Sequence, residues 1–453
     1  MNTTEWISSK VSKLQEAITP LLVANASKRT LEELKAIIDP SVSEVEGGKR
    51  AKRVADWYAK APIEYRRECW LLMSEHFKAD PEVAKTAQAK FAAAVGTPEE
   101  AVAEVRLRKS TVSPRRRLLQ RFSVFPEGIQ FLVSMRAEIL PFLKADMKSD
   151  KRLLALDAEM EYMFSTWFDV GFLELRRISW DSPASLIEKL IKYEAVHDIK
   201  SWADVKNRLD SDRRCYGFFH PRMPNEPLIF VEVALLHDIA SSILPLLDES
   251  ADAEDLNKST TAIFYSISNT QTGLRGVSFG DSLIKNVVET LKMEFPKLKT
   301  FATLSPIPGF KSWLSKNAAT MLEQLDEKEL TKLGKAVGFQ PPTAEHLIFA
   351  LDKVLELDAK SPIAQVLLAC AAHYLGREIR DGEPVDPVAR FHLGNGARIE
   401  RLNWAGDPSV KGLKQSYGLM VNYLYDLKRL DKHRNMLAQG KIPVSGDIEA
   451  LYI

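Results

Sequence analysis

The spacing of apolar residues divides the chain into two parts. In the first third, apolar residues recur three and four positions apart, as at Ile7, Val11, Leu14 and Ile18, which is typical of one face of a helix. Runs that alternate apolar and polar residues are few before about residue 170. The pattern therefore predicts an all-helical N-terminal region.

After that point, short runs rich in β-branched and aromatic residues predict strands. These runs are PLIFVEVAL (227–235), TAIFYSISNT (261–270), KLKTFATLSP (297–306), ARIERLNWAG (397–406) and GLMVNYLYDL (418–427). A glycine-containing turn and an amphipathic helix, from Leu283 to Leu291, separate the second run from the third, which predicts a strand–helix–strand unit. Residues 311–376 return to helical spacing. The predicted fold class is α+β.

Composition excludes several classes of protein. The chain has 453 residues, 45% of them hydrophobic and 27% charged, which is ordinary for a globular protein. Lys and Arg number 62 against 61 Asp and Glu, and this balance argues against a dedicated nucleic-acid-binding protein. The arginine-rich segment 113–122 is interpreted as a solvated or interface face of the helical region, with an RNA or phosphate patch as the alternative.

No membrane or metal function is expected from the sequence. No run of 18 uncharged apolar residues occurs, and the first residues lack the pattern of a secretory signal. The chain also ends without a peroxisomal SKL-type signal, so we expect a cytoplasmic protein. The three cysteines are interpreted as free thiols, and the eight histidines form no HExxH motif. Cys370 and His373, three positions apart, are interpreted as core residues rather than metal ligands.

One turn has the composition of a phosphate-binding loop. The segment from Arg275 to Asp281 lies between a predicted strand and a predicted helix, where glycines and free backbone N–H groups favour an anion. Its spacing resembles the pyrophosphate loop of the GNAT acyltransferase superfamily, Arg/Gln-x-x-Gly-x-Gly/Ala, with Ser278 in place of the first glycine. A glycine-containing turn that binds no ligand is the alternative.

The same turn contains a Gly-x-Ser-x-Gly match, GVSFG, which is also the nucleophile motif of α/β-hydrolases. A hydrolase nucleophile follows its strand almost at once, whereas about seven residues separate this strand from Gly276. The chain also has no HGGG-type segment. A serine hydrolase that uses Ser278 is therefore a minor alternative.

Two further residues lie where functional side chains are common. His392 precedes Gly394, Asn395 and Gly396, which suggests a turn beside a strand. Ser305 lies at the end of a predicted strand, in a loop stiffened by two prolines, and strand ends often carry site residues. A serine that caps a backbone group is the alternative for Ser305.

Taken together, these segments resemble the malonyl-CoA decarboxylase family. The resemblance covers roughly residues 165–430 and extends on pattern to the helical N-terminal part; it rests on the ordered blocks WFDVGFLELRRISWDSPASLIEKLIKYEAVHDI (167–199), FFHPRMPNEPLIFVEVAL (218–235), FYSISNTQTGLRGVSFG (264–280), FATLSPIPGF (301–310), VARFHLGNGARIERLNWAGD (388–407) and SYGLMVNYLY (416–425). Ordered blocks of this length are far more specific than any single motif above.

The resemblance implies both an architecture and a reaction. It implies a helical oligomerisation domain over 1–168, and a GNAT-like catalytic domain with a mixed sheet and a helical insertion over 169–453. The implied reaction converts malonyl-CoA to acetyl-CoA and carbon dioxide. The implied assembly is a homo-oligomer, a dimer or tetramer, formed through the helical domain. The implied catalytic residues are His392, Ser305 and Ser266, and the CoA phosphate loop falls on Arg275, Gly276, Val277, Ser278, Phe279, Gly280 and Asp281.

These residue types suit a decarboxylation. Loss of carbon dioxide leaves a thioester enolate, which His392 would protonate while Ser305 orients the substrate carboxylate. Tyr425 and Asn422 are further pocket candidates. The thioester itself accepts the electron pair, so no metal, biotin or pyridoxal cofactor is expected. An acyltransferase that moves an acyl group from CoA to an amine is the main alternative, and a non-enzymatic scaffold with a degenerate acyl-CoA domain is another.

Overall fold

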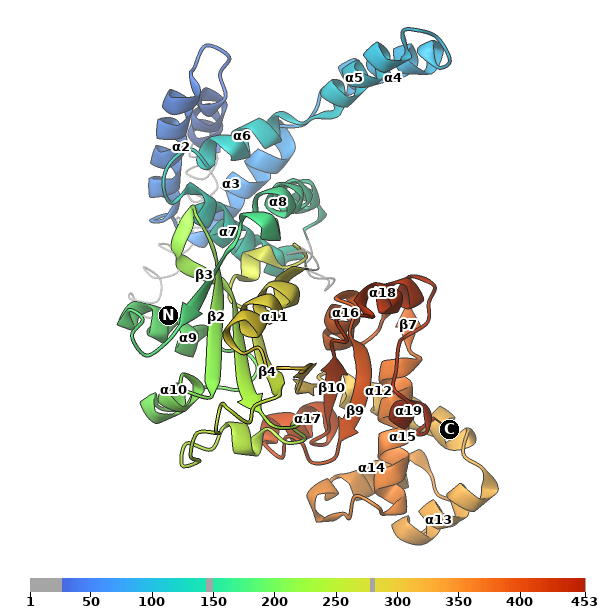
Figure 1. The fold of residues 1–453 in the computed structure, drawn as a ribbon. Coiled ribbons are helices and arrows are strands. Elements are labelled where there is room, and N and C mark those ends of the chain that lie inside the picture. The colour runs from blue at the N-terminus through green and yellow to red at the C-terminus, as the bar shows by residue number, and fades with distance from the viewer. Residues whose placement is uncertain (1–26, 144–149, 278–281, 453) are drawn as a thin grey trace, which may run out of the picture. The chain divides into compact units, whose positions relative to one another are not determined.

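The fold is taken from a computed structural model that describes residues 27–143, 150–277 and 282–452 (Figure 1). The chain forms two compact units. The first comprises Met1–Leu173, His220–Glu226 and Gln271–Phe279, and the second comprises Glu174–Phe219, Pro227–Thr270 and Gly280–Ile453. The helix predicted around residues 7–18 lies outside the described residues.

The main body of the first unit is helical, as predicted. Residues 27–37 are helical, and seven further helices follow along the chain. The helices are α2 (Glu44–Tyr58), α3 (Ile63–His76), α4 (Pro81–Ala94), α5 (Glu100–Thr111), α6 (Pro114–Phe122), α7 (Gly128–Ile139) and α8 (Leu154–Trp167). Leu118, Phe122 and Leu132 are fully buried, so the apolar faces of α6 and α7 contribute to the core of this unit.

The arginine-rich segment forms α6, and two of its arginines are buried rather than presented to solvent. Arg115 donates to the backbone oxygens of Met73 (3.1 Å) and Ser74, which belong to the last turn of α3 and lack helical partners. Arg121 forms an ion pair with Glu44 of α2 (2.6 Å). The expectation of a solvated or interface face is wrong in its solvated form for Arg115 and Arg121, because these buried side chains connect α6 to the neighbouring helices α3 and α2.

The second unit is built on a mixed sheet of eight strands. Its order is β1-β2-β3-β4-β5-β10-β6, and β9 also pairs with β10. The strands are β1 (Glu174–Ile178), β2 (Arg213–His220), β3 (Met223–Leu236), β4 (Thr261–Asn269), β5 (Thr300–Thr303), β6 (Ser305–Pro306), β9 (Arg398–Asn403) and β10 (Met420–Leu424). Strands β7 (Ile379–Arg380) and β8 (Glu383–Pro384) form a separate pair. The α+β class is confirmed.

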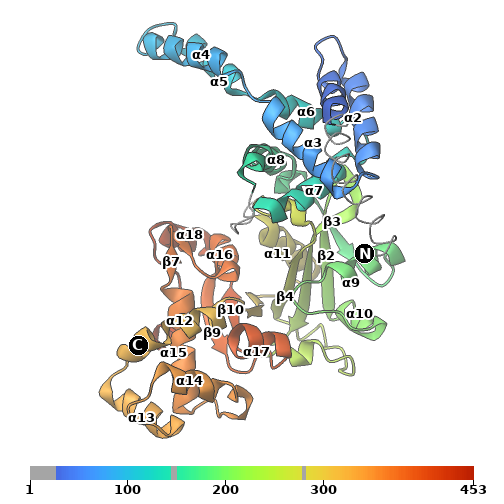
Figure 2. The ribbon, with the colours of Figure 1, turned by 180° about the vertical axis from the view of Figure 1, so that it is seen from behind.

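Helices pack on both faces of the first strands. Helices α9 (Ala184–Tyr193) and α10 (Trp202–Arg208) pack against β1, β2 and β3 through a cluster that includes Leu190, Val205 and Phe230 (Figure 2). Helix α11 (Ser282–Glu294) lies over the opposite face and connects β4 to β5 (Figure 1). These two strands are parallel, so the predicted strand–helix–strand unit is confirmed.

The third predicted strand, 297–306, is divided in the structure. Strand β5 pairs with β4 up to Phe264 and Thr303, and the pairing of the chain then moves to β10, where Ser305 lies opposite Val421. The expectation of one continuous strand is therefore wrong at Leu304, because the strand partner changes there. The cavity of the candidate site lies where the sheet divides in this way.

A helical insertion follows β6, as the spacing of residues 311–376 predicted. It consists of α12 (Phe310–Glu323), α13 (Glu327–Val337), α14 (Ala344–Leu351) and α15 (Pro362–Gly376). The later helices are α16 (Pro387–Gly394), α17 (Val410–Ser416), α18 (Leu430–Ala438) and α19 (Gly446–Glu449). Of these, α16 carries His392, one of the predicted catalytic residues.

Candidate active site

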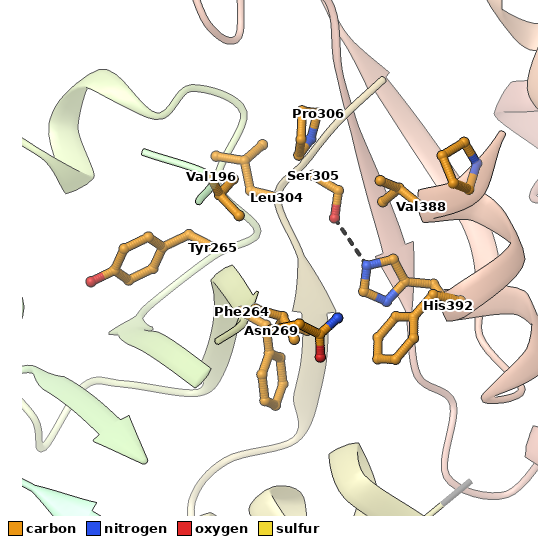
Figure 3. Close-up of a pocket in the computed structure, with 12 residues that line it drawn as sticks. Val196, Phe264, Tyr265, Asn269, Leu304, Ser305, Pro306, Val388 and His392 are labelled. Atoms are coloured by element: carbon orange, nitrogen blue, oxygen red, sulfur yellow. Dashed lines mark hydrogen bonds between the residues drawn. The ribbon is translucent and has the colours of Figure 1, made fainter. Parts of the chain in front are cut away.

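A cavity of about 220 Å³ lies where β4 and β5 separate (Figure 3). Strand β4 contributes one wall, the β5–β6 segment a second and α16 a third. Most of the lining is apolar, and three polar side chains present functional groups to it: Ser305, His392 and Asn269. The lining residues are Val196, Phe264, Tyr265, Ile267, Asn269, Leu304, Ser305, Pro306, Pro387, Val388, Phe391 and His392.

The structure brings the two principal catalytic candidates together. Ser305 Oγ lies 3.3 Å from His392 Nε2, and both side chains are buried. Ser305 comes from β6 and is positioned by the pairing of that strand with β10. The two residues are 87 positions apart in the sequence, so the fold rather than local structure creates the pair.

His392 belongs to a helix, and the turn predicted from the neighbouring residues follows at Asn395 and Gly396, directly before β9. Helix α16 extends from Pro387 to Gly394, and the turn follows it. Asp386 caps the helix: its side chain accepts hydrogen bonds from the backbone N–H groups of Val388 and Ala389, both at 2.9 Å. Pro387 occupies the first helical position, where the absence of an N–H has no cost.

The hydrogen bonds around His392 define its tautomer. The Ser305 hydroxyl donates to Thr303 Oγ1 (2.8 Å), so its oxygen is left to accept from His392 Nε2. The other ring nitrogen, Nδ1, lies 2.8 Å from the Tyr425 hydroxyl, which can donate to it. The proton of neutral His392 is therefore assigned to Nε2, the nitrogen that faces Ser305.

Burial keeps His392 neutral. Desolvation lowers the pKa of His392 to about 3, because no described carboxylate compensates for a buried imidazolium. None of the twelve residues that line the cavity is Asp, Glu, Lys or Arg. An anion in this cavity would therefore meet hydrogen-bond donors but no fixed cation.

Ser266 does not reach the Ser305–His392 pair. It lies on β4 between the cavity-lining residues Tyr265 and Ile267, and its hydroxyl donates to the Glu194 carboxylate at 2.7 Å. The same carboxylate accepts the backbone N–H of Val196 at 2.7 Å, and Val196 lines the cavity. Glu194 therefore connects Ser266 to Val196 in the cavity wall. The catalytic assignment of Ser266 stays a prediction.

Part of the predicted phosphate loop is described with the first unit. Arg275 is exposed, and its backbone carbonyl accepts a hydrogen bond from Arg136 Nη1 (2.8 Å), which also holds the carbonyl of Gly273. Gly276 has a positive φ of 84°, a conformation that favours glycine, and Val277 follows it. The other predicted loop residues, Ser278, Phe279, Gly280 and Asp281, lie outside the described residues.

The two further pocket candidates have different roles. Tyr425 contacts His392 directly. Asn422 donates to the Thr303 carbonyl (2.7 Å) and accepts from Asn403 (2.9 Å), so it connects strands and does not line the cavity.

Sequence reasoning missed three residues around the site. Thr303 lies two positions before Ser305, and strand alternation could have placed it on the same face. Asp386 precedes Pro387 in a helix-start signature that was available in the sequence. Asn269 carries no sequence signal, because only the separation of β4 from β5 exposes it to the cavity.

Comparisons with known proteins agree with the resemblance. A family model described as the malonyl-CoA decarboxylase C-terminal domain matches residues 171–452, and one described as the N-terminal domain matches 77–168. The mitochondrial malonyl-CoA decarboxylase of Anser anser anser is 38% identical over 336 residues, 72% of this chain and 66% of that protein. The Rattus norvegicus enzyme is 38% identical over 335 residues, 72% of this chain and 68% of that protein.

Solved structures extend the similarity to most of the chain. The malonyl-CoA decarboxylase of Rhodopseudomonas palustris gives a TM-score of 0.80 at 38% identity, and the comparison covers 94% of this chain and 99% of that one. The malonyl-CoA decarboxylase of Cupriavidus metallidurans gives a TM-score of 0.74 at 42% identity, and the comparison covers 94% of this chain and 100% of that one.

Fold and site together define an α+β protein with a buried serine–histidine pair where its sheet divides. The chain belongs to the malonyl-CoA decarboxylase family. The aligned region spans about two thirds of the length of the curated relatives. Their names place those proteins in mitochondria, and the cytoplasmic location expected for this chain stays a prediction. No described helix is long and apolar enough to cross a membrane.

Proposed function

We propose that this protein decarboxylates malonyl-CoA to acetyl-CoA and carbon dioxide. The observation that carries the proposal is a buried Ser305–His392 pair in a mostly apolar cavity that has no charged lining residue. The cavity, about 220 Å³, is large enough for a malonyl group but not for CoA, so the CoA portion would remain outside.

The absence of a cation among the lining residues favours loss of the carboxylate. A carboxylate that leaves water for an apolar cavity loses hydration that no fixed positive charge replaces. The transition state disperses that charge toward the thioester, and carbon dioxide leaves as a neutral molecule. The cavity therefore interacts less unfavourably with the transition state than with the substrate, which is the condition for catalysis.

The proton balance assigns a role to His392. Cleavage of the carbon–carbon bond leaves its electron pair on the thioester enolate, and the α-carbon must then gain one proton. The enolate that forms as carbon dioxide leaves is an anion beside His392, and it raises the pKa of the imidazole from its low value, so the ring takes a proton from solvent at that stage rather than when malonyl-CoA binds. His392 Nε2 would deliver that proton to carbon and return to the neutral state.

The other predicted site residues act around this step. The Ser305 hydroxyl would orient the substrate carboxylate and His392, and Ser266 would position Val196 through Glu194. The segment from Arg275 to Asp281 would bind the CoA phosphates, and Ser278 would contribute only backbone. The thioester accepts the electron pair, so the proposed reaction uses no separate metal or organic cofactor.

The experiment is to incubate purified protein with malonyl-CoA alone and to follow acetyl-CoA by mass spectrometry. His392→Ala and Ser305→Ala are compared with His237→Ala, because His237 is exposed and lies outside the cavity. We expect His392→Ala to lower kcat by about 10²–10⁴-fold, the usual contribution of a general acid. His237→Ala should match the wild type.

The outcomes separate the candidate functions. If the wild type and His392→Ala form acetyl-CoA at similar rates, the proposed reaction is supported and the proposed role of His392 as proton donor is contradicted. No acetyl-CoA, together with binding of CoA, would favour the acyltransferase alternative, which needs an amine acceptor.

A further inference from the structure

The cavity holds one polar side chain that the mechanism above does not use. Asn269 is the last residue of β4, and Figure 3 shows its carboxamide pointing into the cavity, on the side of His392. No hydrogen bond joins this carboxamide to any other described side chain or backbone group, whereas the nearby Ser266, Ser268 and Ser305 all have partners. We propose that Asn269 is a catalytic residue that donates from Nδ2 to the thioester oxygen of the substrate as the enolate forms.

This assignment rests on the proposed function and on the direction in which a malonyl group must enter. Ser305 and His392 are 6% and 3% exposed, so they form the closed end of the cavity, whereas Asn269 is exposed and marks its open end. Because CoA cannot fit inside, the thioester must lie at the open end and the carboxylate at the closed end. Asn269 is therefore the lining side chain placed to meet the thioester oxygen.

The chemistry requires a donor at that oxygen. Decarboxylation transfers an electron pair from the breaking carbon–carbon bond to the thioester, whose oxygen gains negative charge only as the reaction proceeds. Neutral donors aimed at such an oxygen stabilise the transition state more than the ground state. Tyr265 also lines the cavity and carries a donor, but it is buried and its hydroxyl points away from the cavity (Figure 3).

The test compares two variants with the wild type. Asn269→Ala should lower kcat by about 10²–10³-fold, the range seen when one donor to a developing oxyanion is removed. The KM for malonyl-CoA and the inhibition constant of acetyl-CoA should change by less than about threefold, because the lost interaction forms mainly in the transition state. Thermal unfolding of each variant shows whether the fold is intact.

The pH dependence of Asn269→Asp distinguishes a hydrogen-bond donor from a residue that only supports the structure. Aspartate has almost the same shape but no donor when ionised, so its activity at pH 7 should fall at least as far as that of Asn269→Ala. As the pH falls toward about 4, protonation supplies an O–H donor, and the activity of Asn269→Asp relative to wild type should rise. Asn435→Asp, the same change on the exposed face of α18, is the matched control and should keep wild-type activity.

Each remaining outcome is decisive. If Asn269→Ala keeps kcat within about threefold of wild type, or loses activity only through KM, the assignment is overturned. A loss of activity through KM alone would mean that Asn269 binds the substrate equally in the ground state and the transition state. Wild-type protein that makes no acetyl-CoA would overturn the proposed function and this assignment together, whereas an active wild type with an unaffected variant overturns this assignment alone.

Discussion

At the scale of single residues, the proposed chemistry depends on a histidine that burial keeps neutral. His392 lies between the hydroxyls of Ser305 and Tyr425 and stacks on the ring of Tyr423, with centroids 4.7 Å apart. Each contact fixes the orientation of the imidazole, and none supplies a negative charge. The charge that makes His392 an acid must therefore come from the substrate.

This requirement predicts an unusual pH dependence. A general acid with a free-enzyme pKa of about 3 is almost fully deprotonated between pH 5 and 8. We therefore expect kcat/KM for malonyl-CoA to rise as the pH falls across this range, by up to about tenfold per pH unit. Steady-state rates at constant ionic strength would check this. A plateau that begins near pH 6.5 would show instead that His392 titrates at its ordinary pKa in the free enzyme.

Tyr425 gives a second prediction at this scale. Tyr425→Phe keeps the ring but removes the hydroxyl that lies 2.8 Å from His392 Nδ1, which leaves a buried acceptor without a donor. Such a loss costs the folded state about 1–3 kcal/mol. The imidazole also loses one of the contacts that orient it, so kcat should fall by up to about a hundredfold. Tyr423→Phe is the matched control, because the Tyr423 hydroxyl has no hydrogen-bond partner among the described residues. Equal effects of the two substitutions would contradict a specific role for the Tyr425 hydroxyl.

At the scale of elements, the cap of α16 connects three parts of the second unit. One Asp386 oxygen accepts the first N–H groups of α16, and the other accepts the Tyr374 hydroxyl of α15 at 3.3 Å. The backbone N–H of Gly309, just before α12, lies near enough to this carboxylate to lower its pKa, against the larger effect of burial, which raises it. Gly309 ends the short loop that follows β6, the strand of Ser305, so Asp386 lies between the segment that carries the serine and the helix that carries the histidine.

Asp386→Ala should therefore affect both stability and catalysis. Loss of the cap alone costs about 0.5–2 kcal/mol, and the helix that holds His392 should move relative to Ser305. We expect a lower midpoint of urea unfolding together with a lower kcat. Asp80→Ala is the control, because Asp80 caps α4 through the same Asp–Pro arrangement but lies in the first unit. A variant of Asp386 that loses stability but keeps its kcat would limit this residue to capping.

The same elements show what the sequence can and cannot predict. Periodicity located the helical first third and the β4–α11–β5 unit, because both signals are local. Helix α16 has eight residues, about two turns, which is too short for periodicity to distinguish from a turn. Ser305 and His392 could be named through the family resemblance. Their contact, and the contact of Ser266 with Glu194, join residues 87 and 72 positions apart, which only the fold brings together.

At the scale of the whole molecule, the first unit contains a hairpin that lacks a core of its own. Helices α4 and α5, of 14 and 12 residues, extend away from the other helices of this unit (Figure 1). No residue of α4 is buried, and α5 buries only Ala103. Val83, Val102 and Val105 are each about half exposed. Helices of this length are marginal alone in water, so the hairpin needs another surface to stabilise it.

We therefore expect the predicted homo-oligomer to form through this hairpin. Val83→Glu combined with Val105→Glu would place two negative charges on the apolar surface, and burying them would cost more than the contact provides. Size-exclusion chromatography with light scattering should give a multiple of the chain mass for the wild type and the single-chain mass for the double variant. Lys85→Glu changes the net charge by the same two units, but on the opposite side of α4 from Val83, so it should keep the wild-type mass. A double variant with the wild-type mass would locate the self-association outside this hairpin, and a monomeric wild type would contradict the oligomer itself.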